Sequence, residues 1–599
     1  MTDPEESQRV PLPRTEHSRP EGATWVDAPQ ETPITVHILL RHRTPLPLDD
    51  LAKGRLRLSV AEFSEKHGAD PAALDRVRRF AEEHGLTVID SNPTWRTVSL
   101  EGDAASLGHA FGVSLLNYEL SGRRYRSYTG QVSLPKEIAA VVEWVFGLHE
   151  HGLGVPSHTS AGPAPGRPSV PASRVVASES RTGTPSPPVP SYTPPRFAEL
   201  YDFPDNLGSG ECVGVLALSG GYSESDMRTF FDELGLPMPT ILDVGPNLRS
   251  TDPSTFWFNF EVTMDVQVVS SCVPEATTVV YFSGARTDDE ITYWTYFKVI
   301  CMGLFDDVHS PSVLTMSAGL PENLFGNWTL EEAEIVNDLL ACASLLGVTV
   351  CMPAGDSGSI FPNGFGMFSA PTVPYFPGSS PWVLCCGGTS LTVDELGQAQ
   401  NEVVWNCLAN HMWNVYLMDD GTWLPAPPPS TNPPAPPWYL PSNLGSGSGG
   451  VSWYFDLPWF QEQANVPPFE IRNFVNWAFD SLQTIRGRGV PDIAANADFL
   501  SGYRVFIDGQ WRNGGGTSAS TPLMASLMVR CNEALGRSVG YVTPWLYELK
   551  LSQGAEIFNQ IEGNNGGYLA TKGDGWNPCV GLGSPKGRAL LKALRTIYP

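Results

Sequence analysis

From residue 211 onward, short and continuously apolar segments alternate with longer segments of helical periodicity. A strand that is apolar along its whole length must be buried on both faces, as happens in a parallel sheet. The alternation of such strands with helices places helices over both faces of that sheet. The sequence therefore predicts an α/β fold, with strands at 212–218, 278–282, 313–317 and 348–352 and helices at 223–234, 289–303 and 329–346.

Residues 32–151 form a separate block with its own pattern of elements. Their order is strand–helix–strand–strand–helix–strand, which is typical of a small α+β domain of the split βαβ type. The predicted strands are 33–40, 86–90, 96–102 and 113–118, and the predicted helices are 70–84 and 104–111.

Three segments have compositions that do not favour a packed core. Residues 1–31 are expected to form a disordered tail. Residues 152–196 are rich in Pro, Ser, Gly and Thr and lack apolar periodicity, which predicts a solvated linker whose exposed backbone is open to proteolysis. Residues 407–447 form a Pro- and Trp-rich insert, which we expect to be an exposed loop. The C-terminal domain then comprises residues 197–599.

The chain carries 38 basic and 64 acidic residues, a formal net charge of −26. Nucleic acids and anionic membranes attract basic patches, so neither is an expected partner. No apolar run reaches membrane-spanning length, and the first residues lack the basic and apolar regions of a secretory signal. The ten cysteines show no ligand spacing for zinc. An acid-adapted protein would carry such a charge, since carboxylates become neutral near about pH 4, but so would a generic acidic protein.

Ser518 lies in a turn that leads into a predicted apolar helix. Gly514-Gly515-Gly516 precedes it and allows close approach of the backbone to a ligand. A serine at a helix N-terminus lies near free N–H groups that can stabilise an oxyanion. The alternative is a Ser/Thr N-cap after a glycine-rich loop, and the turn alone does not separate the two. If Ser518 is a nucleophile, its base is expected to be a carboxylate, because only His309 and His411 follow residue 160.

Glu261 and Asp265 are four residues apart, so both side chains lie on one face of a predicted helix. Two close carboxylates cannot ionise independently, so the pKa of one of them is raised. A glutamate of this kind can act as a general base under acidic conditions. The alternative is a solvated helix face, against which the apolar neighbours at 256–266 argue.

Asp356 follows a predicted strand in the sequence Gly355-Asp356-Ser357-Gly358. Parallel sheets bind ligands at the carboxyl ends of their strands, so a protonated Asp356 is a candidate donor to an oxyanion. The same four residues resemble the nucleophile loop of trypsin-like proteases, but the α/β surroundings argue against that interpretation. The alternative is an Asx turn at the end of the strand.

Together these elements resemble the sedolisin family of serine-carboxyl peptidases. The N-terminal block is similar to the family's pro-kumamolisin activation domain, and the motifs occur in the family's order over residues 32–598, apart from the linker and the insert. The matching segments are 62–71, 84–88 and 111–113 in the N-terminal block, and 348–358, 449–452, 487–498 and 516–520 in the C-terminal domain.

The resemblance implies a subtilisin-like fold and a role for each candidate residue. Ser518 would be the nucleophile and Glu261 its general base. Asp265 would orient Glu261, and Asp356 would complete the oxyanion site. The implied activity is endopeptidase cleavage of proteins or peptides through an acyl-enzyme at acid pH.

The resemblance also implies synthesis as a zymogen. The prodomain would act as chaperone and intramolecular inhibitor until cleavage within the linker. We expect a monomer that works outside the cell or in an acidic compartment, although no signal peptide is visible. A catalytically silent member that serves as a binding or scaffold protein is the alternative, whereas a neutral subtilisin-type protease would lack its histidine.

The family's calcium site uses two Asp carboxylates and backbone carbonyls. Here both acids are replaced by amides, at Gln560 and Asn577. Calcium affinity depends strongly on ligand charge, so we expect weak binding or none. The matching residues are Gln560, Ile561, Gly573, Gly575 and Asn577.

Two further departures from kumamolisin-like relatives concern the site's surroundings. A Glu and a Trp that extend the hydrogen-bonded chain behind the catalytic Asp correspond to Ala217 and Ala318. Trp413, Trp423 and Trp438 lie in the insert, and Trp405 lies just before it. These residues would line a substrate cleft or dock the prodomain, and the alternative is a surface loop without a function of its own.

Overall fold

The central feature of the computed structural model is an eight-stranded sheet. All of its strand pairs are parallel except β19–β20, which confirms the predicted parallel α/β architecture. In spatial order the strands are β11 (Thr240–Val244), β12 (Thr277–Phe282), β10 (Cys212–Ala217), β13 (Val313–Thr315), β15 (Thr349–Pro353), β19 (Leu384–Val393) and β20 (Ala399–Val404), and β27 (Ile493–Asn496) pairs with β19 as well.

The structure describes most of the chain but not the linker or the greater part of the insert. Predictions for 152–191 and for most of 407–447 therefore lie outside it. The described residues are 9–17, 23–26, 33–48, 57–120, 123–150, 192–246, 256–287, 290–322, 328–362, 368–371, 374–394, 397–406, 415–417, 423–425, 445–475, 478–573 and 575–598.

Helices cover both faces of the sheet because its strands are apolar on both sides. In β10, Val213 and Val215 belong to the core that contains helices α8 and α12. Leu216 faces the other way, into the core of α9 and α10, as the two-residue period of a strand requires. The helices are α7 (Glu224–Leu234), α8 (Phe256–Cys272), α9 (Tyr293–Leu304), α10 (Leu330–Leu346) and α12 (Thr517–Leu535).

The N-terminal block forms a four-stranded antiparallel sheet in the order β4-β5-β3-β9. Strands β3 and β4 are separated by β5, which is the arrangement of a split βαβ unit. The prediction is confirmed in topology. The elements are β3 (Ile34–Leu40), α3 (Pro71–Glu83), β4 (Thr87–Asn92), β5 (Thr97–Gly102), α4 (Ala104–Phe111) and β9 (Val142–Phe146).

Two expectations for this block are wrong. The predicted strand 113–118 lies in β6 (Leu116–Leu120), which pairs with β2 (Thr24–Trp25) and β7 (Arg123–Ser127), whereas the fourth strand of the main sheet is β9. The tail is not disordered throughout, because β1 (Arg9–His17) pairs with β8 (Gly130–Pro135). Leu12 of β1 is fully buried. Both errors concern pairing partners that are distant in sequence, which local periodicity does not reveal.

The predicted linker also ends earlier than expected, since Tyr192 hydrogen-bonds Gly502 and α6 begins at Pro194. Within the insert, two short strands are described, β21 and β22. No helix in the described part of the chain is both long and apolar enough to cross a bilayer. The remaining elements are α2 (Val60–His67), α5 (Lys136–Ala139), α6 (Pro194–Leu200), η5 (Trp459–Gln461), α13 (Thr543–Ile557) and α14 (Gly587–Ile597), with the strand pairs β14 (Leu320–Pro321) and β18 (Tyr375–Phe376), β16 (Ile360–Pro362) and β17 (Phe368–Pro371), β21 (Val415–Leu417) and β22 (Trp423–Pro425), β23 (Gly450–Asp456) and β26 (Gly487–Val490), β24 (Phe469–Val475) and β25 (Ala478–Ile485), β28 (Tyr503–Ile507) and β29 (Gln510–Gly514), β30 (Phe558–Asn559) and β33 (Ser584–Pro585), and β31 (Gly563–Asn564) and β32 (Leu569–Ala570).

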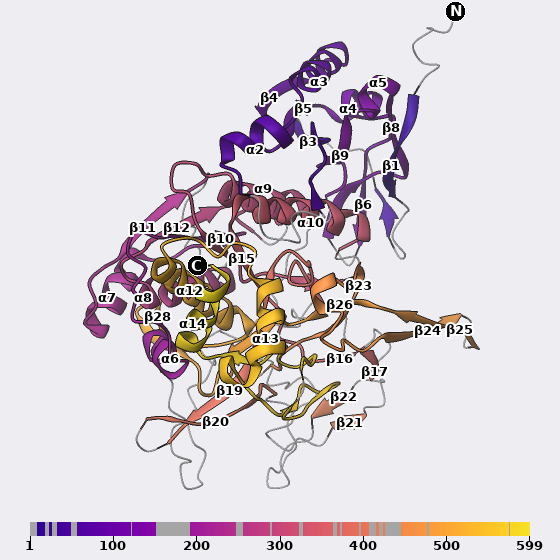
Figure 1. Cartoon of the computed structure of the whole chain (residues 1–599). Coiled ribbons are helices and arrows are strands. Elements are labelled where there is room, and N and C mark those ends of the chain that lie inside the picture. Colours follow the sequence, from indigo (N-terminus) through magenta and orange to yellow (C-terminus); the bar gives the residue numbers. More distant parts are fainter. Residues whose placement is uncertain are drawn as a thin grey trace, which may run out of the picture.

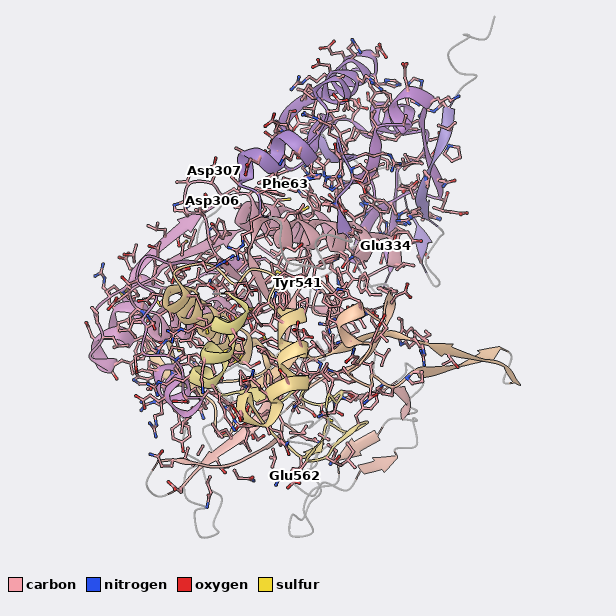
Figure 2. All side chains as sticks on the ribbon, in the orientation of Figure 1. Phe63, Asp306, Asp307, Glu334, Tyr541 and Glu562 are labelled. Atoms are coloured by element: carbon pink, nitrogen blue, oxygen red, sulfur yellow. The ribbon has the colours of Figure 1, made fainter. Side chains whose placement is uncertain are left out.

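The N-terminal block docks on helices α9 and α10, on the side of the sheet away from α8 and α12 (Figure 1). Its apolar anchor is Phe63 of α2, labelled in Figure 2, which is buried with Cys342 and Leu345 and lies 5.1 Å from the ring of Phe305. Leu39 and two aromatic residues of β9 join a second cluster, the core of α9 and α10. Apolar burial therefore holds the two parts together.

Polar contacts add to this docking. The Arg96 guanidinium lies 2.6 Å from Glu143 within the block and 3.0 Å from Asp338 of α10. His42 contacts the same oxygen of Asp338 at 2.9 Å. Because the Arg96 side chain is buried, these partners are needed to offset the loss of its hydration.

Replacing Phe63 by Ala should weaken the docking, because a buried aromatic ring leaves a cavity when it is removed. We expect F63A to lose about 3 kcal/mol of unfolding free energy, measured by urea denaturation with tryptophan fluorescence. L48A, which changes a half-exposed leucine of the same block, should lose less than about 0.5 kcal/mol. Equal losses in the two variants would contradict the anchoring role of Phe63.

Candidate active site

Ser518 is the second residue of α12 and is fully buried. The N-cap of this helix is Gly516, whose φ of 81° favours glycine and which has no side chain of its own to cap the helix. The alternative role of Ser518 as an N-cap is therefore wrong. A Cβ built on Gly514 would lie 2.6 Å from the Sδ atom of Met264 in α8, and one on Gly515 would lie 2.7 Å from Phe499. The glycines thus allow the start of α12 to lie against α8.

Ser317 connects Ser518 to the acid pair of α8. It lies two residues beyond β13, at the carboxyl end of that strand. Its Oγ is 2.8 Å from Oδ1 of Asp265 and 3.0 Å from the backbone oxygen of Ser518. The Ser518 hydroxyl in turn donates weakly to the Ser317 carbonyl at 3.4 Å. The structure therefore brings Asp265 and Ser518 to one place through a residue that the sequence analysis did not single out.

Glu261 and Asp265 are both buried on α8, with exposures of 7% and 3%. Their described neighbours Phe260, Val262 and Met264 are buried as well. The alternative of a solvated helix face is therefore wrong. Glu261 lies one helical turn before Asp265, so both carboxylates share the face that Asp265 presents to Ser317.

Asp356 contacts Thr517, the residue that precedes Ser518. It follows β15, and its Oδ1 accepts hydrogen bonds from the backbone N–H of Thr517 at 2.7 Å and from the Thr517 hydroxyl at 2.8 Å. Thr517 Oγ1 also accepts from the N–H of Gly355 at 3.1 Å. A carboxyl group at a helix N-terminus is favoured by the free N–H groups there. Asp356 is thus bound to the start of α12, and its role is not limited to an Asx turn at the end of β15.

Histidine does not contribute to this arrangement in the described part of the chain. His309 pairs with Asp306 at 2.6 Å, before β13 and therefore at the opposite end of that strand from Ser317. His411 lies outside the described residues. The chemistry available is that of a buried hydroxyl at a helix N-terminus with carboxyl groups on both sides.

Glu322 is a further buried acid near the site, and the sequence analysis missed it. Its carboxylate accepts from the Ser452 hydroxyl and from the N–H of Trp453, both at 2.7 Å. Burial raises its pKa to about 7, although these hydrogen bonds act in the opposite direction. Glu322 thereby connects the segment after Ser317 to the motif 449–452. Its signal in the sequence was weak, since a single acid beside Pro321 is common in loops.

Ala217 and Ala318 lie at the ends of neighbouring strands, as their positions in the sequence predict. Ala217 ends β10 and is buried, and Ala318 follows Ser317 and packs against the core of α9 and α10. Neither side chain can extend a hydrogen-bonded chain behind Asp265.

The segment that corresponds to the calcium site is held by amide hydrogen bonds. Oδ1 of Asn577 accepts from the N–H groups of Cys579 at 3.0 Å and Val580 at 3.1 Å, which occupies both of its lone pairs. Gln560 is exposed. Among the described residues no group of three or more His, Cys, Asp or Glu side chains is placed to hold a metal ion. These residues do not fit calcium, which prefers several charged oxygen ligands.

The comparisons with known proteins agree on one family. The family described as "Pro-kumamolisin, activation domain" matches residues 25–151, beginning slightly before the predicted boundary at 32. Kumamolisin of Bacillus sp. (strain MN-32) is 36% identical over 550 residues, which cover 90% of this chain and 86% of kumamolisin.

Sedolisin of Pseudomonas sp. (strain 101) is 24% identical over 540 residues, covering 88% of this chain and 80% of that protein. The solved structure of Pseudomonas sedolisin (serine-carboxyl proteinase) complexed with two molecules of pseudo-iodotyrostatin has a TM-score of 0.52 at 22% identity, covering 68% of this chain and 98% of the other. This likeness shows that the folds agree.

Calcium and chelators should leave the thermal unfolding temperature of the chain unchanged, because the amides at Gln560 and Asn577 lack the negative charge that calcium ligands supply. The matched comparison is the double variant Q560D/N577D, which restores both charges and should gain a calcium-dependent rise in unfolding temperature. Scanning calorimetry with calcium or with chelator measures both. A chelator-induced loss of stability in the unaltered chain would contradict the expectation.

Proposed function

Since the chain belongs to the sedolisin family of serine-carboxyl peptidases, as a kumamolisin-like serine peptidase with an N-terminal activation domain, we propose that it is an acid-active endopeptidase made as a zymogen. Its substrates are proteins or peptides, and cleavage proceeds through an acyl-enzyme on Ser518. The observation that supports this most directly is the contact of Ser317 with both Asp265 and the backbone of Ser518.

In the proposed reaction the Ser518 oxygen attacks the scissile carbonyl carbon and its proton passes to the Glu261 carboxylate. The tetrahedral oxyanion forms beside Asp356 at the N-terminus of α12, where free N–H groups and the helix dipole stabilise negative charge. Glu261 returns the proton to the leaving amine as the C–N bond breaks. A water molecule then repeats the sequence on the acyl group and releases Ser518.

Acid conditions suit this set of groups. Glu261 must be ionised to accept a proton, whereas Asp356 must be protonated to donate to the oxyanion. Both states coexist only where the pH is close to the pKa values of carboxyl groups, at about pH 4. We therefore propose that the protein works outside the cell or in an acidic compartment, as a monomer.

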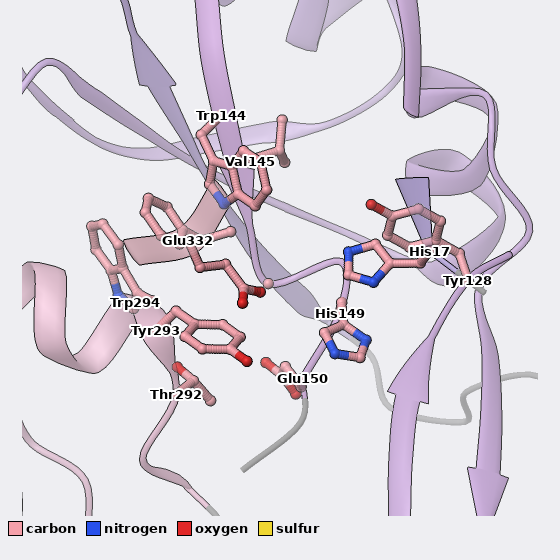
Figure 3. A pocket seen from close by; sticks show the side chains of 12 residues that line it. His17, Tyr128, Trp144, Val145, His149, Glu150, Thr292, Tyr293, Trp294 and Glu332 are labelled. Carbon is pink, nitrogen blue, oxygen red and sulfur yellow. The ribbon is translucent and has the colours of Figure 1, made fainter. Parts of the chain in front are cut away.

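The N-terminal block is proposed to inhibit the peptidase until it is released. A cavity at its boundary is lined by His17, His149 and Glu150 from the block and by Thr292 and Glu332 from the C-terminal domain (Figure 3). Burial lowers the pKa of His17 to about 4, although nearby Glu331 acts in the opposite direction.

His37 is held in the same boundary. Its ring stacks on Trp294 of α9 at 3.8 Å, and its Nδ1 lies 2.8 Å from the Ser99 hydroxyl. Burial lowers its pKa to about 3, and the charge of Lys298 acts in the same direction. The neutral ring is favoured in the docked state, so docking is fully stabilised above about pH 6.5 and loses stability as the pH falls from there toward 3.

The alternative, a catalytically silent member that serves as a binding or scaffold protein, predicts a precursor that stays intact at every pH. Ser518, Glu261, Asp265 and Asp356 are all present and buried, and Ser317 and Thr517 link Asp265 and Asp356 to the start of α12, which favours catalysis.

Incubation of the full chain at about pH 4 should cause cleavage within the linker, because a carboxylate serves as the general base in the proposed reaction. S518A should abolish this cleavage, and E261Q should slow it roughly a thousandfold. Gel electrophoresis and mass spectrometry measure the cleavage. S520A removes a hydroxyl of the same helix that donates to the Gly387 carbonyl of β19, and this variant should process normally. Equal processing in S518A and the unaltered chain would contradict the proposed nucleophile, and an inert unaltered chain would support the scaffold alternative.

Replacing His37 by Phe should shift acid activation to lower pH, because the ring still stacks on Trp294 but cannot gain a proton. The rate of linker cleavage, measured between about pH 3 and 7 around the ordinary histidine pKa, reports the midpoint. H109Q changes an exposed histidine of the same block and should leave the midpoint in place. A midpoint in H37F identical to that of the unaltered chain would exclude His37 as a sensor.

A further inference from the structure

The Ser317 hydroxyl lies between two oxygen atoms that both need a hydrogen-bond donor. One is Oδ1 of Asp265 at 2.8 Å, and the other is the backbone oxygen of Ser518 at 3.0 Å. A serine hydroxyl carries one hydrogen and can donate only one strong hydrogen bond. Ser317 is 3% exposed and Ser518 is fully buried, so water has little access to compensate.

The protonation state of Asp265 decides whether both contacts can be hydrogen bonds. When Asp265 carries a proton on Oδ1, it donates to Ser317, and the Ser317 hydrogen is free to donate to the Ser518 carbonyl. When Asp265 is ionised, the Ser317 hydrogen is drawn to the carboxylate, because hydrogen bonds to a charged group are stronger. The Ser518 carbonyl then loses this donor.

We propose that Ser317 is a positioning residue that anchors the backbone of the nucleophile Ser518 only while Asp265 is protonated. The inference rests on the proposed function, because it concerns the efficiency of attack by Ser518. It makes the position of the nucleophile depend on pH through one neutral hydroxyl. The residue's own carbonyl also accepts the Ser518 hydroxyl at 3.4 Å, so Ser317 contacts the nucleophilic residue at both its side chain and its backbone.

The matched control is the last residue of β13, the strand that leads to Ser317. Thr315 is fully buried two residues before Ser317, and its hydroxyl has no hydrogen-bond partner among the described residues. T315V removes that hydroxyl and keeps the shape of the side chain. It therefore tests for a general effect of altering β13.

The experiment measures kcat and KM of the full chain after acid activation, across the pH range in which the unaltered enzyme is active. In S317A we expect kcat to fall about tenfold at the acid end, the worth of one neutral hydrogen bond, with KM changed less than about twofold. The ratio of kcat between the unaltered enzyme and S317A should decline toward one as the pH rises and Asp265 loses its proton. In T315V the ratio should stay close to one at every pH.

Two further variants keep the test decisive. D265N cannot be ionised, so adding S317A to it should reduce kcat by the same factor at all pH values. S317T restores the hydroxyl and should recover most of the lost kcat. If S317A does not yield folded protein, S317C is measured in its place, since a thiol is a weak donor and must show the same decline with a smaller amplitude.

The outcomes separate this inference from the proposed function. A ratio that stays constant with pH, in an enzyme that S518A inactivates, would overturn the role of Ser317 and leave the function standing. A constant ratio near one would do the same. An unaltered chain that is inactive at every pH would overturn both.

Discussion

The N-terminus of α12 is the point on which the rest of the structure depends. It buries a hydroxyl and the carboxyl groups of Asp265 and Asp356 in a nearly dry interior, where unpartnered polar groups are costly. Asp356 binds the first N–H of the helix, and Ser317 bridges Asp265 to the second residue. These bonds tie α12 to β15 and β13, so the sheet positions the site directly. Gly514 and Gly515, which precede α12, permit the approach by having no side chain.

Much of the architecture could be predicted from periodicity. The parallel sheet follows from continuously apolar strands alternating with helices, and α10 is preceded by its N-cap Thr329, which forms a capping box with Glu332. Strand partners over long distances could not be predicted in this way. β1 contains two prolines and four charged or ionisable side chains, which locally favour a tail, yet it pairs with β8 more than 110 residues later. Tertiary pairing overrode local propensity there.

The candidate site shows the same division. Ser518, Glu261, Asp265 and Asp356 belong to motifs with distinctive spacing, and the structure holds three of them through described hydrogen bonds. Ser317 and Thr517 have small, neutral side chains, and nothing in the sequence separates their hydroxyls from many others. Their importance arises from geometry, because a hydroxyl matters when two acceptors lie within 3 Å of it. Glu322 was missed for a related reason, since its partners at Ser452 and Trp453 are more than 120 residues away.

The docking of the N-terminal block on α9 and α10 has a kinetic consequence. Covalent attachment keeps the block at a high effective concentration, so even modest affinity suffices to hold it in place. Cleavage of the linker removes none of these contacts. Docking of the block on the C-terminal domain then becomes a bimolecular association. The fraction of peptidase domain that carries a bound N-terminal block then falls on dilution. At high protein concentration the cleaved block would rebind.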